Sequence, residues 1–166
     1  MFVGDGTKIG SHVVLEGWTT IGKECLIYHG ACLGGPPQDL KFKGEKSFLY
    51  IGDHTAIREY AVIHRATGEG EETRVGSNCM IMGATHIAHN CQLGNYVIMS
   101  NSAGLAGHVV VEDRAIISGM TGVHQLVKIG RNAMVAGASK VVQHGPTFVI
   151  DDGRPVRDSG LNSAGM

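Results

Sequence analysis

Large aliphatic residues recur at every sixth position along most of this chain. The series runs in one phase from Val3 to Val141, and it is broken at Asp39, Glu45 and Glu69. A small residue usually stands two positions before the aliphatic one, and a glycine often follows it. A period of six fits neither the turn of an α-helix nor the alternation of an isolated strand. It is the sequence signature of a parallel β-helix, in which each hexad forms one short strand and one turn.

Three hexads close one triangular coil of such a helix, so the aliphatic and small residues point into a prism and fill it. The repeat predicts an all-β domain over residues 1–144 with about eight coils, roughly 38 Å long at ~4.8 Å per coil. It lapses at residues 34–50 and 68–74, which we expect to leave the coils as loops, and loops on a rigid scaffold often carry function. Residues 145–166 lack the repeat, and we expect them to form an irregular tail.

Composition excludes several classes of function. The formal charge of -1 does not suit a nucleic-acid binder, which would carry a strong basic excess. No apolar run reaches the ~18 residues of a membrane span, and the first residues lack the pattern of a secretory signal, so we expect a cytoplasmic location. The four cysteines have no zinc-ribbon spacing. Three of them occupy small inward positions, where we expect them to pack as apolar residues: Cys25, Cys79 and Cys91.

None of the nine histidines falls on an inward position, so we expect them on the outside of the prism. Positions three hexads apart stack on successive coils, and this brings one polar cluster together. Its members are His86, His89, Asn90, Gly107, His108, His124 and Gln125. Gly104 and Gly122 stack over His86 and leave that side open, which predicts a groove for a ligand or for another chain.

The cluster has three possible interpretations from the residues alone. Histidine is the commonest metal ligand, but no three of the four histidines stand out as a set. A second possibility is an inert trimer interface. The third is acid–base chemistry, with His89 as the base and Asn90 or His108 as the partner that orients it. The Gly107 N–H, one coil away, would then stabilise an oxyanion.

Several motifs resemble those of one family, the UDP-N-acetylglucosamine O-acyltransferases of lipid A synthesis (the LpxA type). They follow one another in family order: QDLKFKGE (38–45), IREYAVIHRAT (57–67), THIAHNCQLGN (85–95), NSAGLAGHVVVED (101–113), SGMTGVHQ (118–125) and IGRNAMVAGAS (129–139). The resemblance implies a homotrimer of left-handed parallel β-helices with active sites between neighbours. It implies transfer of a 3-hydroxyacyl group from acyl carrier protein to the glucosamine 3-hydroxyl of UDP-GlcNAc, without a metal or bound organic cofactor.

The resemblance also implies roles for individual residues. His89 would be the general base, with Asn90 at the position beside it, while Gly107 would bind the oxyanion and His108 would position substrate. The substrate-binding set would be Gln38, Asp39, Lys41, His86, His124, Gln125 and Asn162. The acyl chain would lie against Met134 and Gly137. When positions three hexads apart are stacked, Asp39 and Gly137 fall on two faces of the prism other than that of His89. We therefore expect a neighbouring subunit to complete the site.

Two departures from the family pattern keep alternatives open. Asn90 stands where many members have Asp, and the family usually begins about two coils earlier and continues into a C-terminal helical domain. The alternatives are a truncated trimeric scaffold that binds substrate without turnover, the related N-acyltransferase of the same pathway, and a metal-dependent γ-type carbonic anhydrase, which is also a β-helix.

Overall fold

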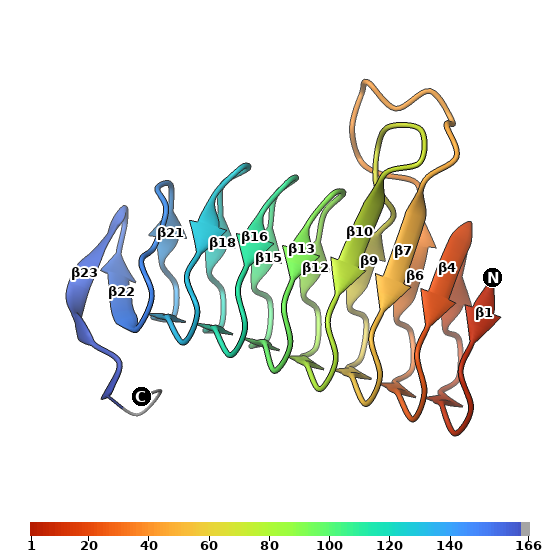
Figure 1. Cartoon of the computed structure of the whole chain (residues 1–166), viewed down its shortest axis with the longest axis horizontal. Coiled ribbons are helices and arrows are strands. Elements are labelled where there is room, and N and C mark those ends of the chain that lie inside the picture. The colour runs from red at the N-terminus through yellow and green to blue at the C-terminus, as the bar shows by residue number, and fades with distance from the viewer. Residues whose placement is uncertain (164–166) are drawn as a thin grey trace.

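The structure, a computed structural model, describes residues 1–163 and is a left-handed parallel β-helix with three sheets along its sides (Figure 1). Sheet A contains β1 (Phe2–Val3), β4 (Trp18–Ile21), β7 (Phe48–Ile51), β10 (Glu72–Val75), β13 (Gln92–Leu93), β16 (Val110–Val111) and β19 (Lys128–Ile129). Sheet B contains β2 (Lys8–Ile9), β5 (Leu26–Ile27), β8 (Ala56–Ile57), β11 (Met80–Ile81), β14 (Ile98–Met99), β17 (Ile116–Ile117), β20 (Met134–Val135), β22 (Val149–Gly153) and β23 (Val156–Leu161). Sheet C contains β3 (Val14–Leu15), β6 (Cys32–Gly35), β9 (Val62–His64), β12 (His86–Ile87), β15 (Gly104–Leu105), β18 (Gly122–Val123) and β21 (Lys140–Val141).

The core is built as the repeat predicts. The aliphatic residue of each hexad points into the prism and stacks on its equivalent in the next coil, as Ile87 does on Leu105. The three predicted inward cysteines are also buried. Burial raises the pKa of the Cys91 thiol to about 12, so this thiol packs as a small neutral side chain.

The corners between sheets require backbone in the left-handed region. At the corner between sheets C and A, the φ angles are 58° for Asn90, 61° for His108 and 65° for Leu126. Placing a residue other than glycine in this region costs about 1 kcal/mol of conformational free energy, and the packing of the coil compensates for that cost. Because every coil turns in the same way, equivalent corner residues project outward in register.

Both predicted loops leave the coil at this same corner (Figure 1). The longer one, residues 36–47, joins β6 to β7, and the shorter one, residues 65–71, joins β9 to β10. The longer loop is therefore shorter at both ends than the predicted 34–50, and the shorter loop lies three residues earlier than the predicted 68–74. Arg65 anchors the longer loop, because its guanidinium donates to the Gly34 carbonyl at 2.9 Å and lies against the rings of Trp18 and Phe42.

The C-terminal segment is more regular than the expected irregular tail. Strand β22 pairs in parallel with β20, and β23 folds back on it as an antiparallel hairpin. Val156 is buried in the core cluster, so the hairpin covers the last coil of the prism. The hairpin reverses the chain direction, which is why it does not continue the period of six. No helix long and apolar enough for a membrane crossing occurs in residues 1–163.

Candidate active site

A cleft of about 640 Å³ lies at the corner between sheets C and A, under the longer loop. Its lining residues are Gln38, Asp39, Leu40, Lys41, His89, His108, Gln125 and Leu126. The loop supplies one wall, and three successive corners of the coil supply the other. His89, His108 and Gln125, predicted to lie on one face of successive coils, line this cleft together, and the loop adds charged side chains.

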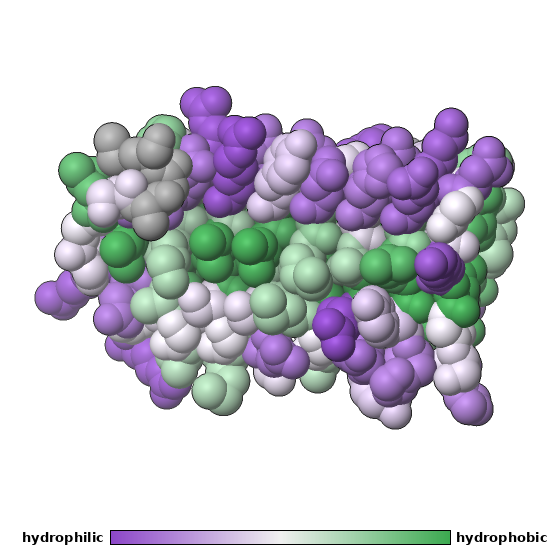
Figure 2. Space-filling model, turned by 90° about the horizontal axis from the view of Figure 1, so that it is seen from below, coloured by the Kyte–Doolittle hydropathy of each residue, from purple (hydrophilic) through white to green (hydrophobic). Residues whose placement is uncertain are grey.

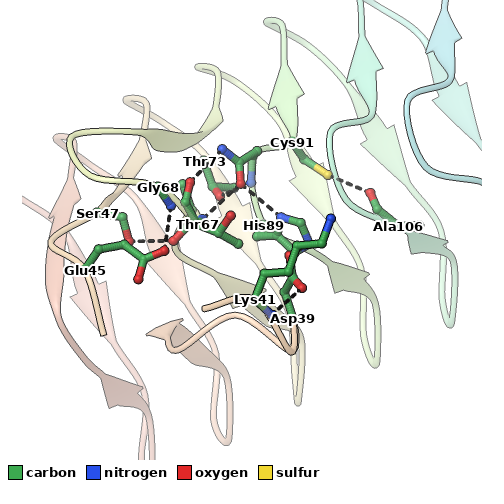
Figure 3. Close-up of polar contacts among 12 residues, drawn as sticks. Asp39, Lys41, Glu45, Ser47, Thr67, Gly68, Thr73, His89, Cys91 and Ala106 are labelled. Atoms are coloured by element: carbon green, nitrogen blue, oxygen red, sulfur yellow. Dashed lines mark hydrogen bonds and ion pairs between the residues drawn. The ribbon is translucent and has the colours of Figure 1, made fainter. Parts of the chain in front are cut away.

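The His89 ring is held in one tautomer. Its Nδ1 lies 2.9 Å from the Asn90 Oδ1 (Figure 3). The orientation of the Asn90 amide is set by Thr67, whose N–H donates to Oδ1 at 2.9 Å and whose carbonyl accepts from Nδ2 at 3.2 Å. Because Oδ1 can only accept, the hydrogen of the neutral ring sits on Nδ1. The Nε2 atom is left with a free lone pair, as a general base requires.

The Nε2 side of the ring faces an acid and a glycine. The Asp39 Oδ2 lies 3.9 Å from Nε2, too far for a direct hydrogen bond. A Cβ atom built at Gly107 would lie 2.6 Å from Nε2, so only glycine leaves room for the ring in this position. The N–H of Gly107 donates to no group within residues 1–163, so it is available to a ligand in the cleft. The His108 ring packs edge-on against His89 with the centroids 5.2 Å apart.

The position of Asp39 corrects the column count. That count placed Asp39 on a different face from His89, but the loop does not follow the coil and folds back over the corner. One Asp39 oxygen accepts the Lys41 N–H at 2.9 Å and orders the loop, while the other faces His89 (Figure 3). A single subunit therefore brings Asp39 and His89 together. The face that the count assigned to Asp39 was therefore wrong.

The predicted polar cluster divides into two parts. His86 and His124 line a second groove, of about 470 Å³, on the outer face of sheet C. Side chains placed at Gly104 and Gly122 would meet nothing within 4 Å, so this groove is open as predicted.

His64 lies outside the prism, as expected for all nine histidines, but it is buried there. It is 7% exposed, and its ring contacts that of His86 with the centroids 5.0 Å apart. Burial, together with nearby His86 and His89, lowers the pKa of His64 to about 4. Burial also lowers the pKa of His86. Both rings are therefore neutral at pH 7.

Three predicted residues lie outside the cleft of their own chain. Met134 is on the outer face of sheet B, and Gly137 follows it at the corner between sheets B and C. Asn162 is buried beside the C-terminal hairpin, where its side chain donates to the Asn132 carbonyl at 2.6 Å. Within residues 1–163, no group of three or more His, Cys, Asp or Glu side chains is arranged to hold a metal ion.

Curated relatives and solved structures point to one family, although no family model matches the chain. The acyl-[acyl-carrier-protein]–UDP-N-acetylglucosamine O-acyltransferase of Gloeothece citriformis is 48% identical over 154 residues, and that of a Synechocystis strain is 49% identical over 154 residues. Each match covers 93% of this chain and 56% of the relative, so the chain spans little more than half the length of these curated relatives.

Solved structures give the same result. LpxA from Acinetobacter baumannii is 42% identical with a TM-score of 0.96, and the match covers 99% of this chain and 64% of that one. The UDP-N-acetylglucosamine acyltransferase from Campylobacter jejuni is 38% identical with a TM-score of 0.87, over 99% of this chain and 69% of that one. The chain belongs to the UDP-N-acetylglucosamine O-acyltransferase family. This family membership and the stacked sheets confirm the left-handed β-helix predicted from the hexads.

For this member of the family, the sequence alone did not reveal the groups that support His89. Thr67 binds the Asn90 side chain through its backbone, which no side-chain pattern can indicate. The Thr73 hydroxyl accepts the Asn90 N–H at 2.8 Å. Glu45 was visible as a break in the repeat and as the last residue of the QDLKFKGE motif, and neither sign indicated its contact with Gly68.

Proposed function

We propose that this chain transfers a 3-hydroxyacyl group from acyl carrier protein to the glucosamine 3-hydroxyl of UDP-GlcNAc, the first step of lipid A biosynthesis. The observation that carries the proposal is the fixed tautomer of His89, with Nε2 free at the cleft beside Gly107. The names of the relatives supply the substrate class. The cytoplasmic location expected from the sequence belongs to the same proposal.

The cleft geometry supports a simple course for the reaction. The His89 Nε2 takes the proton of the sugar hydroxyl while that oxygen attacks the thioester carbon. The Gly107 N–H donates to the oxyanion that forms on the former carbonyl oxygen. The C–S bond then breaks, and the protonated ring returns its proton to the leaving sulfur. Asp39 and Lys41 line the same space, where they can bind sugar hydroxyl and phosphate groups.

The outer face of sheet B supports a homotrimer as part of this proposal. An apolar stripe runs along it (Figure 2), formed by stacked outward residues of successive coils. These residues are Leu26, Ala56, Met80, Ile98, Ile116, Met134 and Ile150. A long apolar stripe with polar edges is typical of a protein interface. We infer that it packs near the cleft of a neighbour, where Met134 and Gly137 would line the path of the acyl chain.

A transfer assay with 3-hydroxyacyl-[acyl carrier protein] and UDP-GlcNAc tests the function. His89→Ala should lower the rate about 10³-fold, because a general base contributes that order of rate enhancement. The variant should keep the oligomeric state of the parent, measured by light scattering. A variant that transfers at the parent rate would show that His89 is not the base.

Binding without turnover is the second candidate, and Asn90 favours it because a neutral amide stabilises a protonated ring less than a carboxylate does. Calorimetric titration with UDP-GlcNAc beside the transfer assay separates the two functions. Transfer to the 3-amino sugar nucleotide alone would indicate the N-acyltransferase. Stoichiometric zinc by elemental analysis would point to the carbonic anhydrase class.

A further inference from the structure

Two glutamates that break the hexad series cross-link the two loops. The Glu45 Oε1 accepts the Gly68 N–H at 3.0 Å, so a side chain of the longer loop holds the backbone of the shorter one. In the reverse sense, the Glu69 Oε2 accepts the Lys46 N–H at 3.0 Å. The two contacts have the same length and chemistry but lie on opposite loops, which makes each a natural control for the other.

The Glu45 contact continues toward the proposed base (Figure 3). The Glu69 contact ends on the Lys46 N–H of the longer loop. The Gly68 N–H belongs to the same peptide group as the Thr67 carbonyl, which accepts from the Asn90 Nδ2. The Asn90 Oδ1 in turn accepts from the His89 Nδ1. Imidazole, side-chain amide, peptide group and carboxylate thus form one head-to-tail series in which every N–H donates toward Glu45.

Such a series can transmit the effect of a charge. Hydrogen bonds arranged head to tail polarise one another, by about 10–30% per bond. A carboxylate at the acceptor end makes the peptide oxygen and then the Asn90 oxygen better acceptors. The charge is in place at pH 7, because backbone N–H groups of Glu45 itself, Gly68 and Lys43 hold the pKa of the Glu45 carboxyl below its usual value.

We propose that Glu45 is a positioning residue that stabilises protonated His89 through two amide groups. It supplies the negative charge that the neutral Asn90 side chain lacks. The connection also explains the use of asparagine, since an aspartate has no N–H to give to the Thr67 carbonyl. The inference rests on the proposed function only for its effect on the rate of acyl transfer. The protonation of the His89 ring can be measured without substrate.

The test follows the titration of the His89 ring by ¹⁵N NMR in the full chain, with the signal assigned by its loss in His89→Gln. Glu45→Gln should lower the midpoint of the His89 titration by about 0.3 pH unit. It should also raise the fraction of neutral His89 rings that carry their hydrogen on Nε2. Glu69→Gln should match the parent in both. The other titratable and charged groups around the ring are identical in both variants, and they are Asp39, Lys41, His64 and His108.

A double-mutant cycle excludes a trivial displacement of the loop. Asn90→Asp removes the Nδ2 donor and so cuts the series, and in that background Glu45→Gln should leave the midpoint unchanged. Equal shifts in Glu45→Gln and Glu69→Gln, or a shift that persists in the Asn90→Asp background, would overturn the proposal. If the NMR results agree but no variant transfers acyl groups, the proposed function fails while the inference stands.

Discussion

At the scale of single residues, His89 depends on a neighbour that has no side chain. A methyl group at position 107 would lie 2.5 Å from the ring carbon Cε1, so the ring must turn away from Asn90. We expect Gly107→Ala to lower transfer about 10²-fold, as a misplacement of about 1 Å does. Steady-state kinetics measure the loss. Gly104→Ala, whose added methyl meets nothing within 4 Å, is the matched control for folding and should unfold at the temperature of the parent. Parent-like transfer by Gly107→Ala would contradict the assigned ring position.

His64 gives stability a dependence on pH. Its Nδ1 is buried without a hydrogen-bond partner within residues 1–163, and its pKa is lowered to about 4. The unfolded chain, where His64 titrates normally, therefore binds the extra proton first as the pH falls. The stabilisation is complete above about pH 6.5 and is lost progressively down to about pH 4. Between pH 7 and pH 5, we expect the parent to lose about 2 kcal/mol more than His64→Gln, measured by urea unfolding. Equal losses would show that His64 titrates normally in the folded protein.

At the scale of elements, Arg65 holds the longer loop over the cleft. Its guanidinium donates to the Gly34 carbonyl and contacts the rings of Trp18 and Phe42, and a lysine ammonium cannot reproduce these planar contacts. The lost contacts amount to roughly 1–2 kcal/mol. Arg65→Lys should therefore loosen Asp39, raise the KM for UDP-GlcNAc about tenfold and lower the unfolding temperature by roughly 2–8 °C. Limited proteolysis within residues 36–47 measures whether the loop has become more mobile. Faster cleavage with an unchanged KM would show that the loop does not contribute to the binding of UDP-GlcNAc.

The elements also show how far the sequence reaches. The period of six fixes which residues point inward, so stacked positions such as His89 and Gly107 could be placed together without coordinates. The two loops have no period, and their paths follow from backbone contacts such as that between Glu45 and Gly68. Asp39 was therefore misplaced, and the cover over His64 was not foreseen. The C-terminal hairpin was missed because it reverses the chain, after which inward positions no longer recur every six residues.

At the scale of the whole molecule, the apolar stripe on sheet B decides whether the site can be shared between subunits. Ile116 lies near the middle of the C-terminal half of the stripe, between Ile98 and Met134. A charge at this position would be buried in an apolar contact, at a cost of several kcal/mol. Ile116→Glu should therefore yield monomers in light scattering.

In the proposed trimer, Met134 and Gly137 of a neighbour line the path of the acyl chain, so transfer should fall when the subunits separate. The His89 signals in NMR should stay as in the parent, since its hydrogen bonds lie within one chain. Val110→Glu is the matched control, because Val110 is an exposed aliphatic residue on sheet A, away from the stripe. If Ile116→Glu still forms trimers, the apolar stripe is not the interface between subunits. Monomers that still transfer a long acyl chain would show that one subunit holds the complete site.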